Sequence, residues 1–453
     1  MKVPWGDREW QRAVVYGLGA SGLAASRLLL SQGVEILGVD SRTEENLELG
    51  DMTVAAGVEL ILGAEPAELP PGIDGVVVSP GVPADRPLLD AARRRDVPVV
   101  AEVELGFLFA EGPVIGITGS NGKSTTTALT GELLKAAGFD VEVCGNIGVP
   151  LSARVEGPAG RIFVTELSSF QLETIDTFRP QAAALLNLAA DHLDRHRNVE
   201  VYFGAKRALF KNQEAEDVAV LNADQDDVVA VEVTARRRLF SRQQSVEDGC
   251  YLDGDRVVEI DPARGSRPLF HRDEIPLAGL HNLENAMAAA LLSRAMGADP
   301  ESFPAALAHF RGLPHRLQKV AERQGISWYD DSKATNFAAT QKSLEGFADG
   351  SVHLILGGRN KGGDPMDIAE IVSRKARCLY LVGEAAGEIW SALGNMVRCE
   401  MSGTIAAAID AAGGSAAGGE IVLLSPGCAS FDQYDSFGER GDHFQHLVRA
   451  FDG

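Results

Sequence analysis

The sequence is poor in cysteine and in positive charge, and it lacks a long hydrophobic run. The five cysteines among its 453 residues form no Cys-x-x-Cys pair, so we expect reduced thiols and neither a disulfide framework nor a zinc site. No run of about 18 apolar residues is present, and the start of the chain is polar and mixed in charge. These features argue against a membrane span and a secretory signal, and we expect a cytoplasmic protein with no membrane insertion.

Acidic residues outnumber basic ones, because 64 Asp and Glu stand against 42 Lys and Arg, which gives a formal net charge of −22. Binding to nucleic acid needs a basic face, so we expect no nucleic-acid partner. The hydrophobic share of 45% and the charged share of 23% are those of an ordinary globular protein. A chain of this length is expected to fold as about three domains, and we expect a monomer.

The most informative stretch runs from residue 114 to residue 137. Residues 114–118 are short, apolar and β-branched, as in a buried strand, and residues 124–137 are typical of a helix, which Gly138 would end. The glycine-rich turn between them would bring backbone N–H groups and a helix N-terminus to one anion. Lys123 would reach the β- and γ-phosphates of a nucleotide, and the Ser124 hydroxyl would hold Mg²⁺. The strict G-x-x-x-x-G-K-[ST] spacing is missed because position 117 is Ile, but the stretch still predicts an ATP site.

A second glycine-rich turn lies near the N-terminus. Residues 14–16 are typical of a strand, residues 17–22 follow the pattern G-x-G-x-x-G, and the next strand, residues 34–39, ends at Asp40. This order indicates a site for a phosphate or pyrophosphate with a sugar or base attached, and it allows NAD and other nucleotide diphosphates equally. A further strand, residues 75–78, runs into a turn rich in Pro and Gly, where open α/β sheets bind ligands.

The middle of the chain places polar side chains after further buried strands. Glu166 ends the strand at residues 162–166, where a carboxylate beside a phosphate loop can hold Mg²⁺; a solvated acid is the alternative. His192 lies in a concentrated polar segment that follows another apolar strand. Lys206 is on a predicted helix and would by itself be an ordinary surface lysine. Asn282 and Asn285, one helical turn apart, could serve an adenine edge or could cap a helix.

The last third of the chain alternates strands and helices again. Strands at residues 352–356 and 421–424 run into loops rich in glycine and polar residues. An earlier strand ends near Asp330 and is followed by a crowded polar stretch. This alternation predicts a third α/β layer with a parallel sheet.

Taken together, these stretches resemble the Mur ligase family, the ATP-dependent peptide ligases of bacterial cell-wall precursor synthesis. The resemblance covers nearly the whole chain and rests on loops in the right order: residues 116–126, 166–172, 191–196, 281–285, 315–316, 330–336 and 425–430. It implies an α/β protein of three domains. These would be a Rossmann-like domain for a UDP-linked substrate (residues 1–106), a central P-loop ATPase-like domain (107–312) and a Rossmann-like C-terminal domain for the amino acid and ATP (313–453).

Within the family, the chain is most similar to the members that add D-glutamate to UDP-N-acetylmuramoyl-L-alanine. The resemblance implies that ATP phosphorylates the substrate carboxylate and that the amine of the amino acid attacks the resulting acyl phosphate. The nearest alternative is the same ligation with L-glutamate or another amino acid. From other classes, the alternatives are an NAD-dependent oxidoreductase built on residues 17–40, which leaves the phosphate loop unexplained, and a non-catalytic nucleotide-binding protein.

The resemblance also implies roles for individual residues. Those expected to be catalytic are Lys123, Glu166, His192 and Lys206. Those expected to hold two Mg²⁺ ions are Ser124, Glu166, His192 and Lys206, the last as a carbamylated lysine. Those expected to bind ATP are Gly119, Ser120, Asn121, Gly122, Lys123, Ser124, Thr125, Asn282, Asn285, Arg316 and Asp331. Those expected to bind the UDP-linked substrate are Ala20, Ser21, Gly22, Asp40, Ser41, Arg42, Gly81 and Asn146, and those expected to bind glutamate are Lys333, Thr335, Lys361, Ser430 and Phe437.

Overall fold

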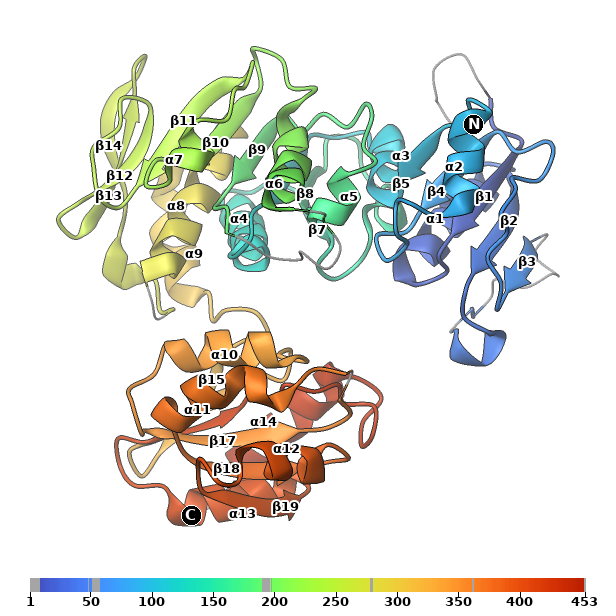
Figure 1. The fold of residues 1–453 in the computed structure, drawn as a ribbon. Coiled ribbons are helices and arrows are strands. Elements are labelled where there is room, and N and C mark those ends of the chain that lie inside the picture. Colours follow the sequence, from blue (N-terminus) through green and yellow to red (C-terminus); the bar gives the residue numbers. More distant parts are fainter. Residues whose placement is uncertain are drawn as a thin grey trace. The chain divides into compact units, whose positions relative to one another are not determined.

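The structure is a computed structural model that describes residues 9–47, 49–50, 58–189, 196, 198–277, 280–360 and 362–451. Two predicted site residues, His192 and Lys361, lie outside the described residues. By its internal contacts the chain divides into two compact units, Met1–Phe310 and Arg311–Gly453. Among the described residues, the first unit contains two β-sheets and the second contains one, each with helices beside it (Figure 1). This architecture agrees with the predicted α/β class.

The N-terminal sheet is parallel throughout its described strands, in the order β3-β2-β1-β4-β5. The chain changes direction across the sheet between β1 and β4, and in open α/β sheets ligands bind at such a point. There the Ser79 hydroxyl donates to Gly17 O at 2.6 Å, which ties the turn after β4 to the turn after β1. The elements are β1 (Arg12–Tyr16), α1 (Ala20–Ser31), β2 (Glu35–Asp40), η1 (Glu44–Asn46), β3 (Val58–Leu62), β4 (Gly75–Val78), α2 (Pro87–Arg94), β5 (Val99–Ala101) and α3 (Glu102–Phe109).

The central sheet has the order β14-β13-β12-β11-β10-β9-β6-β8-β7 in the described part of the chain. Its strands are parallel from β7 to β12, and β13 and β14 extend it as an antiparallel hairpin. The strands are β6 (Val114–Thr118), β7 (Val141–Gly145), β8 (Ile162–Glu166), β9 (Ala182–Leu185), β10 (Val218–Asn222), β11 (Arg236–Ser241), β12 (Gly249–Asp253), β13 (Arg256–Asp261) and β14 (Gly265–His271).

Helices cover the central sheet, and α4 packs against α8 over one of its faces (Figure 1). Because β6 lies between β8 and β9, the loop that joins β6 to α4 is flanked by the ends of both neighbours. The helical segments are α4 (Lys123–Ala136), η3 (Leu151–Ala153), α5 (Ser169–Leu172), α6 (Val199–Arg207), η4 (Ala208–Phe210), α7 (Asp226–Val229), η5 (Arg272–Glu274), α8 (Leu280–Ala295), η6 (Pro300–Ser302) and α9 (Phe303–His309).

The two sheets of the first unit are joined through α3, and one apolar cluster extends from the N-terminal sheet to the central one. Glu104 on α3 is buried, and its carboxylate accepts hydrogen bonds from the N–H groups of Asp176, Thr177 and Phe178 at 2.8 to 3.1 Å. The Thr177 hydroxyl donates to the same carboxylate at 2.5 Å. The predicted domain boundary at residue 106 falls inside this helix, and the division stays a prediction.

The C-terminal sheet has the order β15-β16-β20-β17-β18-β19 among the described residues, parallel except for β15. The predicted α/β layer with a parallel sheet is present, and β15 extends it as an antiparallel edge strand. Gln324 and Gly325 have positive φ angles of 52° and 77°, as a two-residue hairpin turn requires, and they return the chain antiparallel from β15 to β16. The elements are β15 (Gln318–Arg323), β16 (Ile326–Asp330), α10 (Phe337–Glu345), β17 (Val352–Gly357), η7 (Pro365–Ile368), α11 (Ala369–Lys375), β18 (Ala376–Val382), α12 (Ala386–Leu393), β19 (Cys399–Gly403), α13 (Ile405–Ser415), β20 (Ile421–Leu424) and α14 (Phe437–Ala450).

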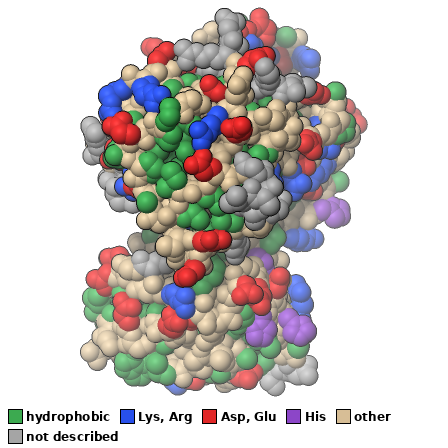
Figure 2. All heavy atoms as spheres, turned by 90° about the vertical axis from the view of Figure 1, so that its right-hand side faces the viewer, with side chains coloured by type: hydrophobic (Ala, Val, Ile, Leu, Met, Phe, Trp, Pro, Cys, Tyr) green, Lys and Arg blue, Asp and Glu red, His purple; other side chains and the backbone are tan. Residues whose placement is uncertain are grey.

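Two surface properties bear on the predicted partners. Within the described residues, no helix has both the length and the apolar character that crossing a membrane requires. On the face drawn in Figure 2, acidic and basic side chains lie interspersed. The expectations of no nucleic-acid partner and of a monomer stay predictions.

Candidate active site

The phosphate loop joins β6 to α4 at the middle of the central sheet. Gly122 has a φ of 83°, which side-chain-bearing residues rarely adopt, and a Cβ there would lie 2.3 Å from Asn285 Oδ1. Glycine is therefore required at position 122, the last residue of the turn before α4 begins. The first N–H groups of that helix have no acceptor within it and can hold an anion. Lys123 Nζ donates to Gly119 O at 3.0 Å and to Ser120 O at 3.1 Å, which keeps its charge at the loop.

A second lysine reaches the same loop from α6. Lys206 is only 1% exposed, and its Nζ donates to Gly119 O at 2.9 Å. The ammonium group lies 4.6 Å from the ring centre of Tyr202, whose hydroxyl is 3.1 Å from Ser120 Oγ. Two ammonium groups, those of Lys123 and Lys206, thus meet at one carbonyl oxygen. The reading of Lys206 as an ordinary surface lysine is wrong, because the side chain is buried beneath the phosphate loop.

Glu166 ends β8 beside this loop. The parallel register of β6 and β8 sets Glu166 next to Ile117, and the Glu166 side chain is only 2% exposed. Its Oε1 accepts a hydrogen bond from Asn146 Nδ2 at 2.9 Å, and the Asn146 N–H donates to Glu166 O, also at 2.9 Å. The other oxygen, Oε2, is buried and accepts no hydrogen bond from any described residue. The alternative of a solvated acid is therefore wrong, since the carboxylate is removed from water.

The donor groups at this edge of the sheet fit a magnesium ion. Carboxylate and hydroxyl oxygens are the hard ligands Mg²⁺ prefers, and Glu166 Oε2 and the buried Ser124 hydroxyl supply them. No group of three His, Cys, Asp or Glu side chains is arranged for a metal in the described part of the chain. Mg²⁺ does not require one, because it keeps waters and substrate phosphates as ligands beside one or two protein groups.

The two predicted adenine-site amides lie one turn apart on α8. Asn285 Nδ2 donates to Asn282 Oδ1 at 3.2 Å, and Asn285 Oδ1 accepts from the Thr126 hydroxyl on α4, also at 3.2 Å. Asn285 is buried against Gly122, so it braces the start of α4. The structure thus brings Asn285 to the phosphate loop, a contact that residue spacing could not decide.

In the glycine-rich turn between β1 and α1, the start of the helix packs closely against the backbone at the end of the strand. A Cβ at Gly22 would lie 1.9 Å from Gly17 O, so only glycine allows α1 to start this close to β1. Asp40, at the end of β2, accepts a hydrogen bond from the Leu18 N–H at 2.7 Å and three from Arg42 at 2.9 to 3.0 Å. Burial alone would raise the pKa of Asp40, but these hydrogen bonds outweigh it and hold the pKa below its ordinary value. Asp40 is thus an anion that orients Arg42 at the rim of the turn.

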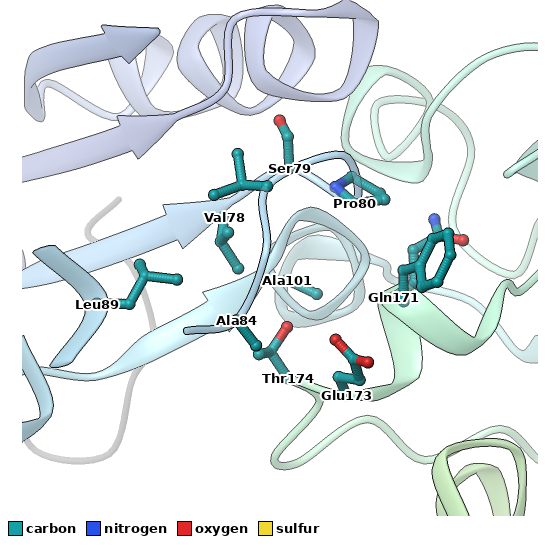
Figure 3. A pocket seen from close by; sticks show the side chains of 11 residues that line it. Val78, Ser79, Pro80, Ala84, Leu89, Ala101, Gln171, Glu173 and Thr174 are labelled. Atoms are coloured by element: carbon teal, nitrogen blue, oxygen red, sulfur yellow. The ribbon is translucent and has the colours of Figure 1, made fainter. Parts of the chain in front are cut away.

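A small pocket lies where the N-terminal sheet faces the central one. Figure 3 shows Ser79 and Pro80, from the turn after β4, opposite Gln171 and Glu173, from α5 and the residue that follows it. This turn contains the predicted substrate residue Gly81, and α5 begins three residues after Glu166. The pocket therefore brings the turn after β4 close to the segment that follows β8, within one compact unit.

Asp331 and the predicted residues that follow it, Lys333 and Thr335, lie in the loop after β16, at the carboxyl end of that strand. Asp331 follows β16 and is 3% exposed, and it accepts hydrogen bonds from the Ser343 and Ser425 hydroxyls at 2.6 and 2.7 Å. A third hydrogen bond comes from the Leu317 N–H at 3.1 Å. Burial raises the pKa of Asp331 to about 6, although these hydrogen bonds and Arg316 lower it. Asp331 therefore fixes the loop that presents Arg316, whose own side chain is exposed.

The predicted amino-acid pocket gathers around the start of α14. Lys333 Nζ lies 6.0 Å from the ring centre of Phe437, and Thr335 is half-buried in the same loop as Lys333. Ser430 is 2% exposed in the loop after β20. The structure thus brings Lys333 and Phe437 together from segments about a hundred residues apart in sequence. The roles of these residues stay predictions.

Sequence reasoning missed two residues that organise these sites. Tyr202, which links Lys206 to Ser120, is four residues before Lys206 on one helix, a spacing that could have identified it. Arg440 is three residues after Phe437 and is deeply buried. A buried arginine cannot be told from an exposed one by sequence, so no signal pointed to Arg440.

Comparison with known proteins identifies the class of this protein. Three family models match consecutive segments: the Mur ligase MurD-like N-terminal domain (residues 11–101), the Mur ligase middle domain (117–293) and the Mur ligase glutamate ligase domain (315–428). The chain belongs to the Mur ligase family and has its three-domain α/β fold. It is a ligase, and the alternative of an NAD-dependent oxidoreductase is set aside.

Curated relatives narrow the comparison to one branch of the family. The UDP-N-acetylmuramoylalanine–D-glutamate ligase of Pelotomaculum thermopropionicum is 43% identical over 451 residues, with 97% of each chain covered. The protein of the same name from Koribacter versatilis is 40% identical over 447 residues, with 98% of each chain covered. Among solved structures, the UDP-N-acetylmuramate–alanine ligase of Thermotoga maritima has the same fold, with a TM-score of 0.59, 18% identity, and 97% of this chain and 99% of that chain covered.

Proposed function

We propose that this chain joins D-glutamate to UDP-N-acetylmuramoyl-L-alanine, with ATP as the phosphoryl donor, in the synthesis of peptidoglycan precursors. The observation that carries the proposal is the similarity to curated D-glutamate ligases along 97 to 98% of the chain. The site supports it, because the side chains gathered there are those that a phosphoryl transfer between two anions needs. Two anions must be held close together, and this requires cations and N–H donors.

The phosphates of ATP would bind at the start of α4. The helix N-terminus offers N–H groups, and Lys123 would exchange its two loop carbonyls for phosphate oxygens. Asn282 and Asn285 would face the adenine from α8. Arg316 and Asp331 are proposed to bind the phosphates and the ribose.

Ser124 and Glu166 would hold the first Mg²⁺, which when bound offsets the charge of the transferring phosphate. Glu166 Oε2 suits this role, since it is buried and accepts no hydrogen bond from the described residues. A second ion would need His192 and Lys206. Lys206 can serve only if it is carbamylated, because an ammonium group repels a cation.

The reaction would take two steps. A carboxylate oxygen of the UDP-linked L-alanine attacks the γ-phosphorus, a new O–P bond forms, and the bond to the β–γ bridging oxygen breaks as ADP leaves. The amine of D-glutamate then attacks the acyl carbon, forms the C–N bond and loses a proton, while the C–O bond breaks and inorganic phosphate leaves. Positive charge from Lys123 would stabilise the negative charge that develops on the transferring group.

The two substrates would bind to different parts of the chain, the UDP-linked one to the first unit and D-glutamate to the second. The UDP moiety would bind at the glycine turn near Asp40 and Arg42, and the muramoyl-alanine would extend along the turn after β4 toward Asn146. D-Glutamate would bind in the second unit, with Lys333 facing its carboxylates. The cationic Lys333 close to an aromatic ring suits a carboxylate that also has an apolar stem.

The test is phosphate release with ATP, Mg²⁺ and UDP-N-acetylmuramoyl-L-alanine, compared for D-glutamate, L-glutamate and no amino acid. We expect turnover with D-glutamate alone. Turnover that depends on L-glutamate would keep the mechanism and change the substrate. No turnover with either amino acid, in a protein that still binds ATP, would overturn the proposal.

A further inference from the structure

Arg440 is a buried cation next to the predicted amino-acid-binding residues. It lies on the first turns of α14, is 2% exposed, and donates from Nε to Ser332 Oγ at 2.9 Å. Its Nη2 donates to Ser332 O at 2.9 Å and its Nη1 to Cys428 O at 3.1 Å. One guanidinium therefore holds the loop after β16 and the loop after β20 in a fixed relation.

A third loop packs against the same guanidinium. A Cβ at Gly358, in the loop after β17, would lie 3.2 Å from Arg440 Nη1, so the glycine backbone passes directly over the cation. The neighbouring Arg359 and Ala429 exchange two backbone hydrogen bonds at 2.8 and 3.0 Å, which join the loops after β17 and β20. Arg440 thus contacts the ends of three parallel strands at once.

Ser332 connects this cation to the predicted glutamate residues. Its hydroxyl accepts from Arg440 Nε and donates to Phe437 O at 2.8 Å, and the next residue in the chain is Lys333. A shift of the guanidinium would therefore move both Phe437 and Lys333, whose Nζ lies over the Phe437 ring.

The charge of Arg440 is placed where the fold alone does not favour it. None of the ion pairs found among the described residues includes Arg440, and its hydrogen-bond acceptors are neutral oxygens. A cation near a helix N-terminus is also opposed by the helix dipole. Burial lowers the pKa of Arg440 to about 10, although Asp432 raises it, so the group stays charged at neutral pH.

We propose that Arg440 is a positioning residue: it holds the loops after β16, β17 and β20 together and so places Lys333 and Phe437 for binding the amino acid. The inference rests on the proposed function, because it concerns how the proposed glutamate site is built. It concerns binding of the amino acid and not phosphoryl transfer from ATP.

The test compares Arg440→Met, which removes charge and hydrogen bonds, with Arg440→Lys, which keeps the charge but cannot form the same set of hydrogen bonds. In the full chain we expect Arg440→Met to raise KM for D-glutamate at least 30-fold while KM for ATP and for the UDP-linked substrate stays within twofold. Arg440→Lys should raise KM for D-glutamate about fivefold. The matched control is Arg449→Met, the same substitution at an exposed arginine of α14, which should leave all three KM values within twofold.

A second measurement does not depend on activity. Hydrogen exchange at the Arg359 and Ala429 amides should accelerate at least tenfold in Arg440→Met and remain unchanged in Arg449→Met. Unchanged KM for D-glutamate in a folded Arg440→Met protein, or an equal rise of all three KM values, would overturn the proposal. If the unsubstituted chain fails to turn over D-glutamate, the proposed function fails, and unchanged exchange in Arg440→Met would then overturn the positioning role separately.

Discussion

Replacing Glu166 by Gln removes one buried negative charge and changes little else. Asn146 Nδ2 can still donate to the side-chain oxygen that it contacts at 2.9 Å. The other carboxylate oxygen accepts no hydrogen bond from any described residue, and a buried polar group left in that state costs about 1–3 kcal/mol, more when it is charged. The amide group that replaces this oxygen would also lack a hydrogen-bond partner, so the substitution recovers only part of this free-energy cost. We predict that the ligand-free variant is more stable by about 1 kcal/mol.

The assay is thermal unfolding with and without ATP and Mg²⁺, together with phosphate release. A gain of about 1 kcal/mol corresponds to a rise of about 2 °C in Tm for a domain of this size. The part of the ATP stabilisation that depends on Mg²⁺ should be lost, because the variant lacks the carboxylate ligand. Phosphate release should fall by about 10²- to 10³-fold. The substitution would thus raise stability while it removes activity.

Glu104→Gln provides the matched control at a second buried acid. Both oxygens of Glu104 accept hydrogen bonds, four in all, so an amide would turn its Nε2 donor toward N–H and O–H donors. We expect this variant to lose about 2–3 kcal/mol and to keep its Mg²⁺-dependent response to ATP. If Glu166→Gln lowers Tm as much as Glu104→Gln does, the reasoning from the unsatisfied oxygen is wrong.

Three further predictions follow from the same structure. Lys123→Ala should reduce kcat/KM for phosphate release by at least about 10³-fold, measured beside circular dichroism as a check of folding, since Nζ holds its charge at the phosphate loop by donating to Gly119 O and Ser120 O. Gly122→Ala should lose ATP binding in calorimetry, because φ is positive and the new Cβ would collide with Asn285. Asp331 has a folded pKa of about 6 against 3.8 unfolded, so the folded state holds the proton more tightly and stability falls as pH rises between these values. Asp331→Asn should abolish up to about 3 kcal/mol of that fall, measured as Tm against pH from 4 to 7.

The order of strands and helices could be predicted wherever the chain uses buried parallel strands. Such strands are short apolar runs, and the strands β1, β6, β8 and β17 stand out for this reason. The edge strand β15 gave no such signal, since its residues are partly exposed and polar. Its direction depends on the positive φ angles of the turn at Gln324, which sequence spacing does not encode.

The site could be predicted as a set of loops but not as a set of contacts. Phosphate-loop chemistry depends on residues close together in sequence, so Lys123 and Ser124 could be recognised from their spacing alone. The burial of Lys206 and its contact with Gly119 arise from packing α6 against the central sheet across 87 residues of sequence. Arg440 depends in the same way on loops after three different strands, and no local pattern marks such a position.

The buried charges of this chain differ in the groups that they contact. Glu259 is buried in the central sheet and pairs with three arginines at 2.8 to 3.1 Å, so its charge is neutralised within the fold. Glu166, Asp331 and Arg440 are equally buried, but the hydrogen bonds described for them are to amides, hydroxyls, carbonyls and N–H groups. Hydrogen bonds to neutral groups compensate only in part for the free-energy cost of removing a charged group from water. At Glu166 the proposed Mg²⁺ would complete the compensation, so binding of ATP with Mg²⁺ should raise stability at the loop that follows β8.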